Sequence, residues 1–286
     1  FNFLYMYLLF DIGGSKMRIT FSRDGESFEK PFIIETPMEY NEGIQALRDI
    51  KLKLVGEEKI KMVVGSIAAS FSADANRLIG GGAQIKNWLE KPIKQDIKQS
   101  FNCPVYMTND SMMGALAQSH FGPAQGYKIS VYLTVSTGVG GAIIVDGKID
   151  DNTFGFEPGW QIIDAGGALC KGWSKKGYLM DYISGISIKQ NTGKKPEDIH
   201  DSAFWESRAN FLAMGLHNVT TIWSPSIITI GGGIMRSIDF KYLEKKYREE
   251  LSVVFPIEQP ILKQAEFGDE MGLYGALAYI KIHHLG

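Results

Sequence analysis

Cysteine is nearly absent from this chain of 286 residues, which holds only Cys103 and Cys170. Two cysteines are too few for a disulfide scaffold or a cysteine-based zinc site, and their scarcity is typical of a reducing compartment. The five histidines show no metal-ligand spacing either. We therefore expect a cytoplasmic protein.

An excess of charge of one sign is also lacking. The chain has 30 Lys and Arg against 32 Asp and Glu, a formal net charge of -2. Such a balance offers no basic surface for a nucleic-acid backbone. The apolar run over residues 1–10 is far shorter than the ~20 residues of a membrane-spanning helix. Neither nucleic acid nor membrane is expected as a partner.

Three catalytic signatures are missing as well: G-x-S-x-G, H-E-x-x-H and G-x-x-x-x-G-K-[ST]. Their absence removes the serine-hydrolase, zinc-metalloprotease and P-loop interpretations. With 44% apolar and 22% charged residues, the composition is that of an ordinary globular protein, and the length allows two domains or one large one.

What the chain does hold is a pair of glycine-rich turns, DIGGSK at residues 11–16 and STGVGG at residues 136–141. Each follows an apolar, strand-like run and places a small hydroxyl residue among glycines. Glycine allows the backbone to approach a ligand closely, and exposed N–H groups with a hydroxyl hold phosphate oxygens. Two such turns favour a nucleoside triphosphate held between two domains.

The remaining pattern alternates strands with helices. Helical spacing covers residues 41–56 and 111–120, a long helical section is expected over 178–222, and an apolar helix over 271–282. Further strands are expected over residues 62–69, 104–108 and 226–230, with a polar loop over 70–82. The two halves resemble diverged copies of one strand-rich plan.

Two carboxylates stand at strand ends. Asp11, beside the first turn, either caps that turn or holds a magnesium ion directly or through water. The second phosphate-type turn favours the metal. Asp110 precedes a helix and is either its N-cap or a general base that takes a proton from an alcohol attacking a γ-phosphate.

Three glycines and a loop offer further candidates. Gly231, Gly232 and Gly233 let the chain pass flat against a ligand, or they form a simple strand-to-helix turn. In the loop over residues 155–161, the Glu157 carboxylate can accept two sugar hydroxyls and the Trp160 indole can stack on a sugar face. A surface acid and a partly buried tryptophan are equally compatible with that sequence.

Taken in order, these residues resemble the ROK family of sugar kinases, which belongs to the hexokinase, actin and heat-shock-chaperone ATPase superfamily. The family motif D-x-G-G-T-K is similar to residues 11–16, with Ser15 for Thr, and the family's N-D is similar to Asn109-Asp110. The motifs G-T-G-V-G-G, I-G-G-G and G-D-x-x-G-L-x-G-A are similar to residues 136–141, 230–233 and 268–276. The resemblance spans nearly the whole chain.

The resemblance implies an α/β protein with the two-lobed actin-like ATPase (ribonuclease H-like) fold and with nucleotide and sugar in the interdomain cleft. The N-terminal lobe would comprise residues 1–110 with 268–286, and the C-terminal lobe residues 111–267. ATP and Mg²⁺ are the implied cofactors, a hexose is the implied partner, and a homodimer is expected at the level of the family.

The resemblance also implies residue roles. Asp110 would be the base that deprotonates the sugar 6-hydroxyl, and Asp11 would help to position magnesium. The implied phosphate-binding residues are Gly13, Gly14, Ser15, Lys16, Thr137, Gly138 and Gly140, and the adenosine-binding residues are Gly231, Gly232 and Gly233. The implied sugar-binding residues are Gln84, Asn109, Asp110, Glu157 and Trp160.

The sugar end departs from the family pattern. E-x-G-H becomes Glu157-Pro158-Gly159-Trp160, so Trp160 replaces a sugar- or zinc-facing histidine. Gln84 stands where P-N-x-x-x-W has its asparagine, and the cysteine-rich zinc segment is missing. We expect a zinc-free kinase with a shifted preference, acting on glucose or a related hexose or N-acetylhexosamine.

Two other interpretations were weighed. A catalytically impaired sugar- or nucleotide-binding sensor of the same fold is disfavoured by the retained Asp11, Lys16 and Asp110. An actin- or chaperone-like ATPase is disfavoured by the short chain and the N-D motif.

Overall fold

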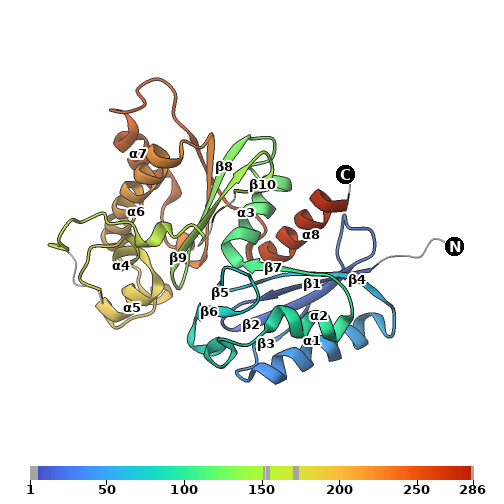
Figure 1. The fold of residues 1–286 in the computed structure, drawn as a ribbon. Helices are drawn as coiled ribbons and strands as arrows, with labels where there is room; N and C mark the ends of the chain where they lie inside the picture. The colour runs from blue at the N-terminus through green and yellow to red at the C-terminus, as the bar shows by residue number, and fades with distance from the viewer. Residues whose placement is uncertain (1–5, 151, 153–154, 170–173, 285–286) are drawn as a thin grey trace. The chain divides into compact units, whose positions relative to one another are not determined.

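The chain folds into two compact α/β units, one of residues 1–117 with 269–286 and one of residues 118–268 (Figure 1). The structure is a computed structural model, and it describes residues 6–150, 152, 155–169 and 174–284, without the side chains of residues 83, 84 and 284. The expected lobe boundary after residue 110 lies at the start of helix α3 (Asp110–His120), whereas the units divide near its end.

The first unit is built on a five-stranded sheet in the order β3-β2-β1-β4-β7. Its strands are β1 (Met6–Ile12), β2 (Lys16–Ser22), β3 (Phe32–Glu35), β4 (Ile60–Ile67) and β7 (Val105–Asn109). Strands β1 to β3 are antiparallel neighbours, whereas β4 and β7 run parallel to β1. The carboxyl ends of β1, β4 and β7 therefore lie at one edge of the sheet.

Helices cover both faces of this sheet. Helices α1 (Tyr40–Val55) and α2 (Ile93–Phe101) pack on one face, and α8 (Met271–His284) packs on the other, against β1 and β4 (Figure 1). Strand residues alternate between the faces, so Leu8 and Phe10 join the core under α1 with the fully buried Trp88. Asp11 follows Phe10 in β1, so its side chain lies on the opposite face, where α8 packs.

The second unit repeats the plan with the order β10-β9-β8-β11-β12. Its strands are β8 (Ile129–Val135), β9 (Val139–Val145), β10 (Lys148–Ile149), β11 (Ile227–Gly231) and β12 (Ile261–Gln264). An antiparallel hairpin is again extended by one antiparallel strand on one side and two parallel strands on the other. The expectation of two copies of one plan is confirmed at the level of sheet topology.

The predicted helix over residues 178–222 is wrong as a single element. The chain forms α4 (Leu179–Ile183), α5 (Gly185–Thr192), the short 3-10 turn η3 (Pro196–Asp198) and α6 (Ser202–Trp223). Ser184 is extended and caps α5 by accepting a hydrogen bond from the Ser187 N–H, and Gly193 ends α5 in the left-handed region. These breaks interrupt a hydrophobic pattern that by itself predicts one helix. Helix α7 (Phe240–Leu251) follows β11.

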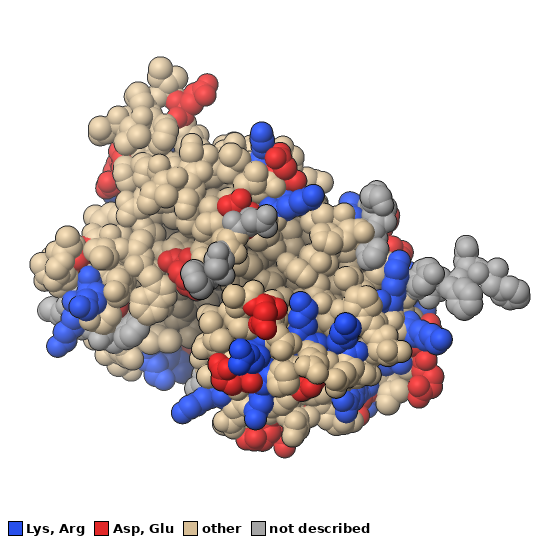
Figure 2. Space-filling view, in the orientation of Figure 1, with Lys and Arg blue, Asp and Glu red and all other residues tan. Residues whose placement is uncertain are grey.

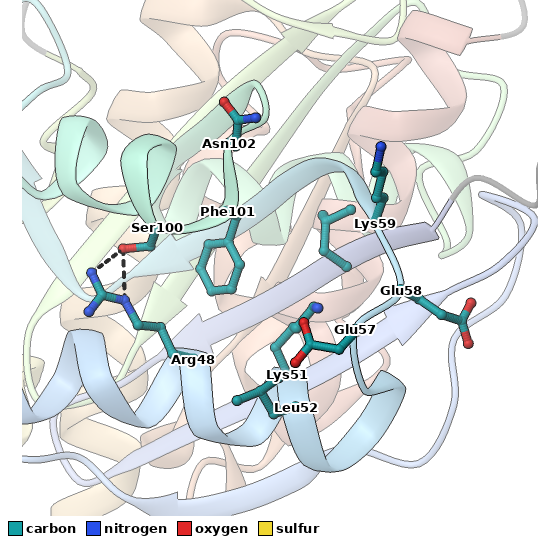
Figure 3. Close-up of a pocket in the computed structure, with 10 residues that line it drawn as sticks. Arg48, Lys51, Leu52, Glu57, Glu58, Lys59, Ser100, Phe101 and Asn102 are labelled. Carbon is teal, nitrogen blue, oxygen red and sulfur yellow. Dashed lines mark hydrogen bonds between the residues drawn. The ribbon is translucent and has the colours of Figure 1, made fainter.

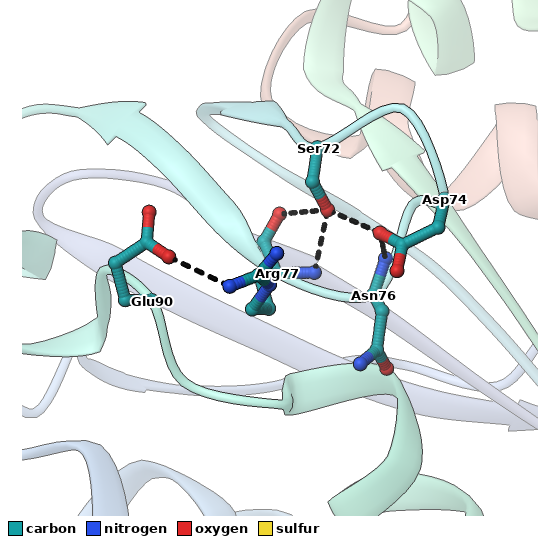
Figure 4. Close-up of polar contacts among 5 residues, drawn as sticks. All are labelled: Ser72, Asp74, Asn76, Arg77 and Glu90. Atoms are coloured by element: carbon teal, nitrogen blue, oxygen red, sulfur yellow. Dashed lines mark hydrogen bonds and ion pairs between the residues drawn. The ribbon is translucent and has the colours of Figure 1, made fainter.

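The loop predicted over residues 70–82 is instead a two-stranded ribbon of β5 (Ala69–Phe71) and β6 (Leu78–Gly81). Its tip is ordered by side chains (Figure 4): Asp74 Oδ1 accepts from the Ser72 hydroxyl at 2.5 Å and from the Asn76 N–H at 3.1 Å. Arg77 reaches Glu90 at 3.0 Å. Local hydrogen bonding thus shapes a polar segment that lacks strand periodicity.

The surface is mixed in charge. On the face that Figure 2 shows, Lys and Arg side chains are interspersed with Asp and Glu. Within the part of the chain that the structure describes, no helix combines the length and apolar character needed to cross a bilayer.

Candidate active site

The first glycine turn is the tip of the β1–β2 hairpin. The Gly13 N–H donates to the Lys16 carbonyl at 2.9 Å and closes the turn, and Thr36 buttresses it by donating its hydroxyl to the Gly13 carbonyl at 2.8 Å. Ser15 and Lys16 are exposed at the tip. A Cβ on Gly14 would meet no atom within 4 Å, and Gly14 is not in the positive-φ region. The fold itself therefore does not require glycine at residue 14.

Asp11 lies at the end of β1 within a row of polar side chains that crosses the sheet. In register, it stands between Arg18 of β2 and Ser66 of β4. The Ser66 hydroxyl donates to Asp11 Oδ1 at 2.5 Å, and Arg18 Nη1 lies 3.9 Å from Asp11 Oδ2. Burial raises the pKa of Asp11, and the Ser66 hydrogen bond and the Arg18 charge oppose that rise.

The donor set around Asp11 fits magnesium. Mg²⁺ keeps several water ligands and binds through one or two carboxylates together with substrate phosphates. Asp11 supplies one such carboxylate beside the first turn, and no cluster of three or more His, Cys, Asp or Glu occurs among the described residues. The expectation that no zinc is bound stays a prediction, and Cys170 lies outside the described residues.

Asn109 and Asp110 join β7 to α3, at the sheet edge where β1 also ends. Asn109 Oδ1 accepts a hydrogen bond from the Met112 N–H at 2.8 Å, which is the bond of an N-cap residue. The Asp110 side chain is exposed, and its Oδ1 accepts from the Ser111 N–H at 2.9 Å. The capping role that the sequence offered to Asp110 thus belongs to Asn109.

The second glycine turn is shorter than its motif. The turn comprises only residues 136–138, since β9 begins at Val139 and contains Gly140 and Gly141. Gly141 allows close packing, because a Cβ there would lie 2.9 Å from the Pro158 ring. Gly185 and Ile186, at the start of α5, donate their N–H groups to the carbonyls of Ser136 and Thr137, at 2.8 and 3.2 Å.

A cavity of about 690 Å³ in the second unit joins two of the predicted segments. Thr137 of the second turn and Gly233, the first residue of the 3-10 turn η4 (Gly233–Arg236), both line it. The other walls include Ile186 and Lys189 of α5 and Arg236 of η4, none of which was predicted from the sequence. No local motif marks these residues, because only the fold brings α5 to the second turn.

The three glycines after β11 have different structural roles. Gly232 has φ +97°, and a Cβ there would lie 2.3 Å from the Val135 carbonyl oxygen, so the fold requires glycine. A Cβ on Gly231 would lie 3.0 Å from the Ala265 side chain, whereas Gly233 has open space around it. Only Gly233 of the three lines the cavity.

Glu157 precedes the short 3-10 turn η2 (Pro158–Trp160), which ends at Trp160 and packs on β9 through Gly159. Trp160 is 42% exposed and contacts the Tyr178 ring edge-to-face, with ring centroids 5.3 Å apart. Glu157 is exposed as a residue, yet partial burial of its carboxylate raises its pKa. The η1 segment (Ala83–Trp88) carries Gln84, whose side chain lies outside what the structure describes.

A further pocket of about 680 Å³ lies away from every predicted site residue, near the carboxyl ends of α1 and α2 (Figure 3). Arg48 directs its guanidinium to the Ser100 hydroxyl, with distances of 3.1 and 2.7 Å, and Lys51 donates to the Gly56 carbonyl at 2.7 Å. Arg48 and Lys51 are thus engaged by the protein, and none of the predicted site residues lines this pocket.

Comparison with known proteins gives one consistent result. The sequence model of the ROK family matches residues 7–282. An N-acetyl-D-glucosamine kinase of Histophilus somni is 26% identical over an alignment of 308 positions, which covers 96% of this chain and 98% of the relative.

Solved structures agree. A ROK hexokinase from Thermus thermophilus superposes with a TM-score of 0.81 at 23% identity, covering 97% of this chain and 99% of the other. A ROK family glucokinase from Streptomyces griseus, in complex with glucose and AMPPNP, gives 0.77 at 22% identity with the same coverage. The actin-like ATPase fold expected from the sequence is confirmed.

Proposed function

The chain belongs to the ROK family, and on that premise we propose that it is an ATP-dependent sugar kinase. It transfers the γ-phosphoryl group of ATP to the 6-hydroxyl of a hexose, either glucose or a related hexose or N-acetylhexosamine. Full-length similarity to an N-acetyl-D-glucosamine kinase and structural similarity to a glucokinase support this activity.

The single observation that carries the proposal is the cavity that unites Thr137 and Gly233. Its volume of about 690 Å³ lies within the range of cofactor sites, and it joins a turn suited to phosphate with a segment suited to a nucleoside. Lys189 and Arg236 add positive charge to the lining, beside one acidic residue, Glu197. These features support a nucleotide at this cavity.

We propose that Asp11 holds magnesium. When bound, the ion neutralises charge on the phosphate oxygens as the phosphoryl group moves. Asp11 would hold it through a carboxylate that Ser66 orients at 2.5 Å. The exposed residues Ser15 and Lys16 of the first turn would contact the phosphates beside it.

Asp110 is proposed as the general base. It accepts the proton of the sugar 6-hydroxyl while that oxygen bonds to the γ-phosphorus and the bond from phosphorus to the ADP oxygen breaks. Two features support the role: the carboxylate is exposed at the end of β7, and Asn109 already makes the capping bond of α3. The capping bond of the helix therefore does not depend on the Asp110 carboxylate.

Sugar recognition is proposed for Glu157, Trp160, Asn109 and Gln84. The exposed Trp160 ring offers a flat apolar surface for a sugar face, and the Glu157 carboxylate can accept hydroxyl hydrogen bonds. Because Trp160 and Gln84 differ from the residues of the family motif, we propose a sugar preference that differs from that of glucose-specific members.

A coupled ADP-release assay tests this function. The purified protein is given ATP and Mg²⁺ with glucose, mannose, fructose, N-acetylglucosamine and N-acetylmannosamine, each alone, and the 6-phosphate product is identified by mass and NMR. The proposal predicts sugar-stimulated turnover with at least one of them. Nucleotide and sugar binding with no turnover on any sugar would instead favour the impaired sensor.

A further inference from the structure

Arg18 is a buried cation that no part of the proposed reaction has yet used. It stands opposite Asp11 in the β1–β2 register and is only 9% exposed. Arg18 Nη2 lies 2.7 Å from Asp269 Oδ2, and Nη1 lies 3.9 Å from Asp11 Oδ2. One guanidinium therefore stands between two carboxylates that are 258 residues apart in sequence, at positions 11 and 269.

The opposite side of the Asp11 carboxylate is fixed as well. Ser66 donates to Oδ1 at 2.5 Å, and the first turn of α8 covers the same oxygen at Gly272. A Cβ on Gly272 would lie 2.5 Å from Asp11 Oδ1 and 2.6 Å from the Ser66 hydroxyl. Asp11 can thus reorient only if Arg18, Ser66 or α8 moves.

The charges in this row determine what a divalent cation beside Asp11 would experience. Asp11 and Asp269 contribute two negative charges and Arg18 one positive charge. Removing the guanidinium leaves the two negative charges of Asp11 and Asp269 uncompensated near the cation. Removing the Asp269 charge leaves the positive charge of Arg18 to offset the negative charge of Asp11. The two changes alter the local potential in opposite directions.

We propose that Arg18 is a positioning residue which, anchored by Asp269, orients the Asp11 carboxylate and sets the divalent-cation concentration that the site requires. This inference rests on the proposed function, in which Asp11 holds the magnesium ion of the nucleotide. Arg18 lies two residues beyond the motif that predicted the first turn, so the motif gave no reason to single it out.

The proposal is tested by measuring Mn²⁺ binding with electron paramagnetic resonance. The protein is titrated with Mn²⁺ in the presence of ADP and without sugar. Arg18→Met is expected to lower the half-saturating Mn²⁺ concentration, and Asp269→Asn to raise it, each by about threefold to tenfold. Arg23→Met is the matched control, because it removes a more exposed ion pair, to Glu58 at 3.4 Å, from the same unit. The control should leave Mn²⁺ binding unchanged.

A merely structural role for Arg18 gives a different result. Both variants would then lower the thermal midpoint while leaving the half-saturating Mn²⁺ concentration within about twofold of the wild-type value, and that outcome overturns the proposal. If Arg18→Met does not fold, Arg18→Gln removes the positive charge and keeps a hydrogen-bonding head group beside Asp269. It should lower the half-saturating Mn²⁺ concentration as Arg18→Met does, and an unchanged value again overturns the proposal.

The assay also separates this inference from the proposed function. Mn²⁺ binding with ADP requires no sugar and no turnover, so it judges Arg18 even if the acceptor is not a hexose. Conversely, a wild-type protein that binds Mn²⁺ and ADP but phosphorylates no sugar contradicts the kinase proposal and leaves the Arg18 measurement interpretable.

Discussion

Asn109 Oδ1 accepts a hydrogen bond of 2.8 Å from the backbone N–H of Met112, and this contact caps α3 immediately before Asp110. The arrangement divides two roles between adjacent side chains. The amide satisfies the helix N-terminus, and the neighbouring carboxylate is presented at the edge of the sheet where Asp11 also lies. Stability and chemistry at this junction can therefore be altered separately.

The first prediction concerns that separation. Asn109→Ala removes the cap and should lower the free energy of unfolding by about 1 kcal/mol. Asp110→Asn should change it by no more than about 0.5 kcal/mol, because the cap is intact. Urea denaturation followed by circular dichroism measures both. Asn109→Asp restores a capping oxygen and should recover most of the loss; equal destabilisation by Asn109→Ala and Asp110→Asn contradicts the division of roles.

The second prediction contrasts neighbouring glycines after β11. Gly232→Ala should destabilise the fold by about 1–3 kcal/mol, since φ is +97° and the Val135 carbonyl lies 2.3 Å from the added Cβ. The Cβ added by Gly233→Ala has no protein atom within 4 Å, so the thermal midpoint of this variant should match that of the wild type. Its ATP affinity should nevertheless fall if Gly233 lines the nucleotide cavity. Unchanged affinity, measured by calorimetry, would remove Gly233 from the site.

The third prediction is a pH effect on sugar binding. Partial burial raises the pKa of Glu157 above its ordinary value, so the carboxylate gains its charge at a higher pH than an exposed glutamate. Since the charged carboxylate is a stronger acceptor than the protonated form, in which one oxygen carries a proton, the KM for sugar should fall as the pH rises through that raised pKa. Glu157→Gln should lose this component of the pH profile. Identical profiles for the two proteins exclude the role.

The fourth prediction distinguishes two metals. EDTA should abolish sugar-dependent ATP turnover, because it removes the ion that neutralises the phosphates. Added Mg²⁺ should restore turnover, because one carboxylate together with the phosphates is enough to bind that ion. A zinc-selective chelator should leave both the turnover and the thermal midpoint unchanged. Loss of folded protein with that chelator, followed by recovery on adding Zn²⁺, would contradict the zinc-free prediction.

The sequence predicts the two glycine turns well, because each lies between apolar runs whose strand character is local. Strand β1 ends at Ile12, one residue beyond Asp11, and the second turn follows Val135 as expected. The sequence predicts that the two halves resemble each other, but it does not predict the strand order that the two sheets share. Their pairing, with β4 and β11 inserted beside the first strand of each hairpin, comes from long-range contacts.

The missed features share a physical cause. Ile186 and Lys189 line the cavity because α5 begins with N–H groups bonded to the second turn, about 50 residues away in sequence. Arg18 gains its partner Asp269 only when α8 packs on β1 and β4. Neither contact has a local signal. The capping of α3 by Asn109 likewise has no local signal that distinguishes it from capping by Asp110, and the role of Asp110 as a base stays a prediction.

The proposed role of Asp110, as the base of a phosphoryl transfer to a sugar hydroxyl, is tested by measuring turnover and ATP binding in the same variant. The kcat of Asp110→Asn is compared with that of the wild type on the best sugar of the panel, and the ATP dissociation constant of each is measured in parallel. The account predicts a fall in kcat of about 10²- to 10⁴-fold with ATP binding within about twofold. A kcat near that of the wild type, in a variant that binds ATP normally, would contradict it.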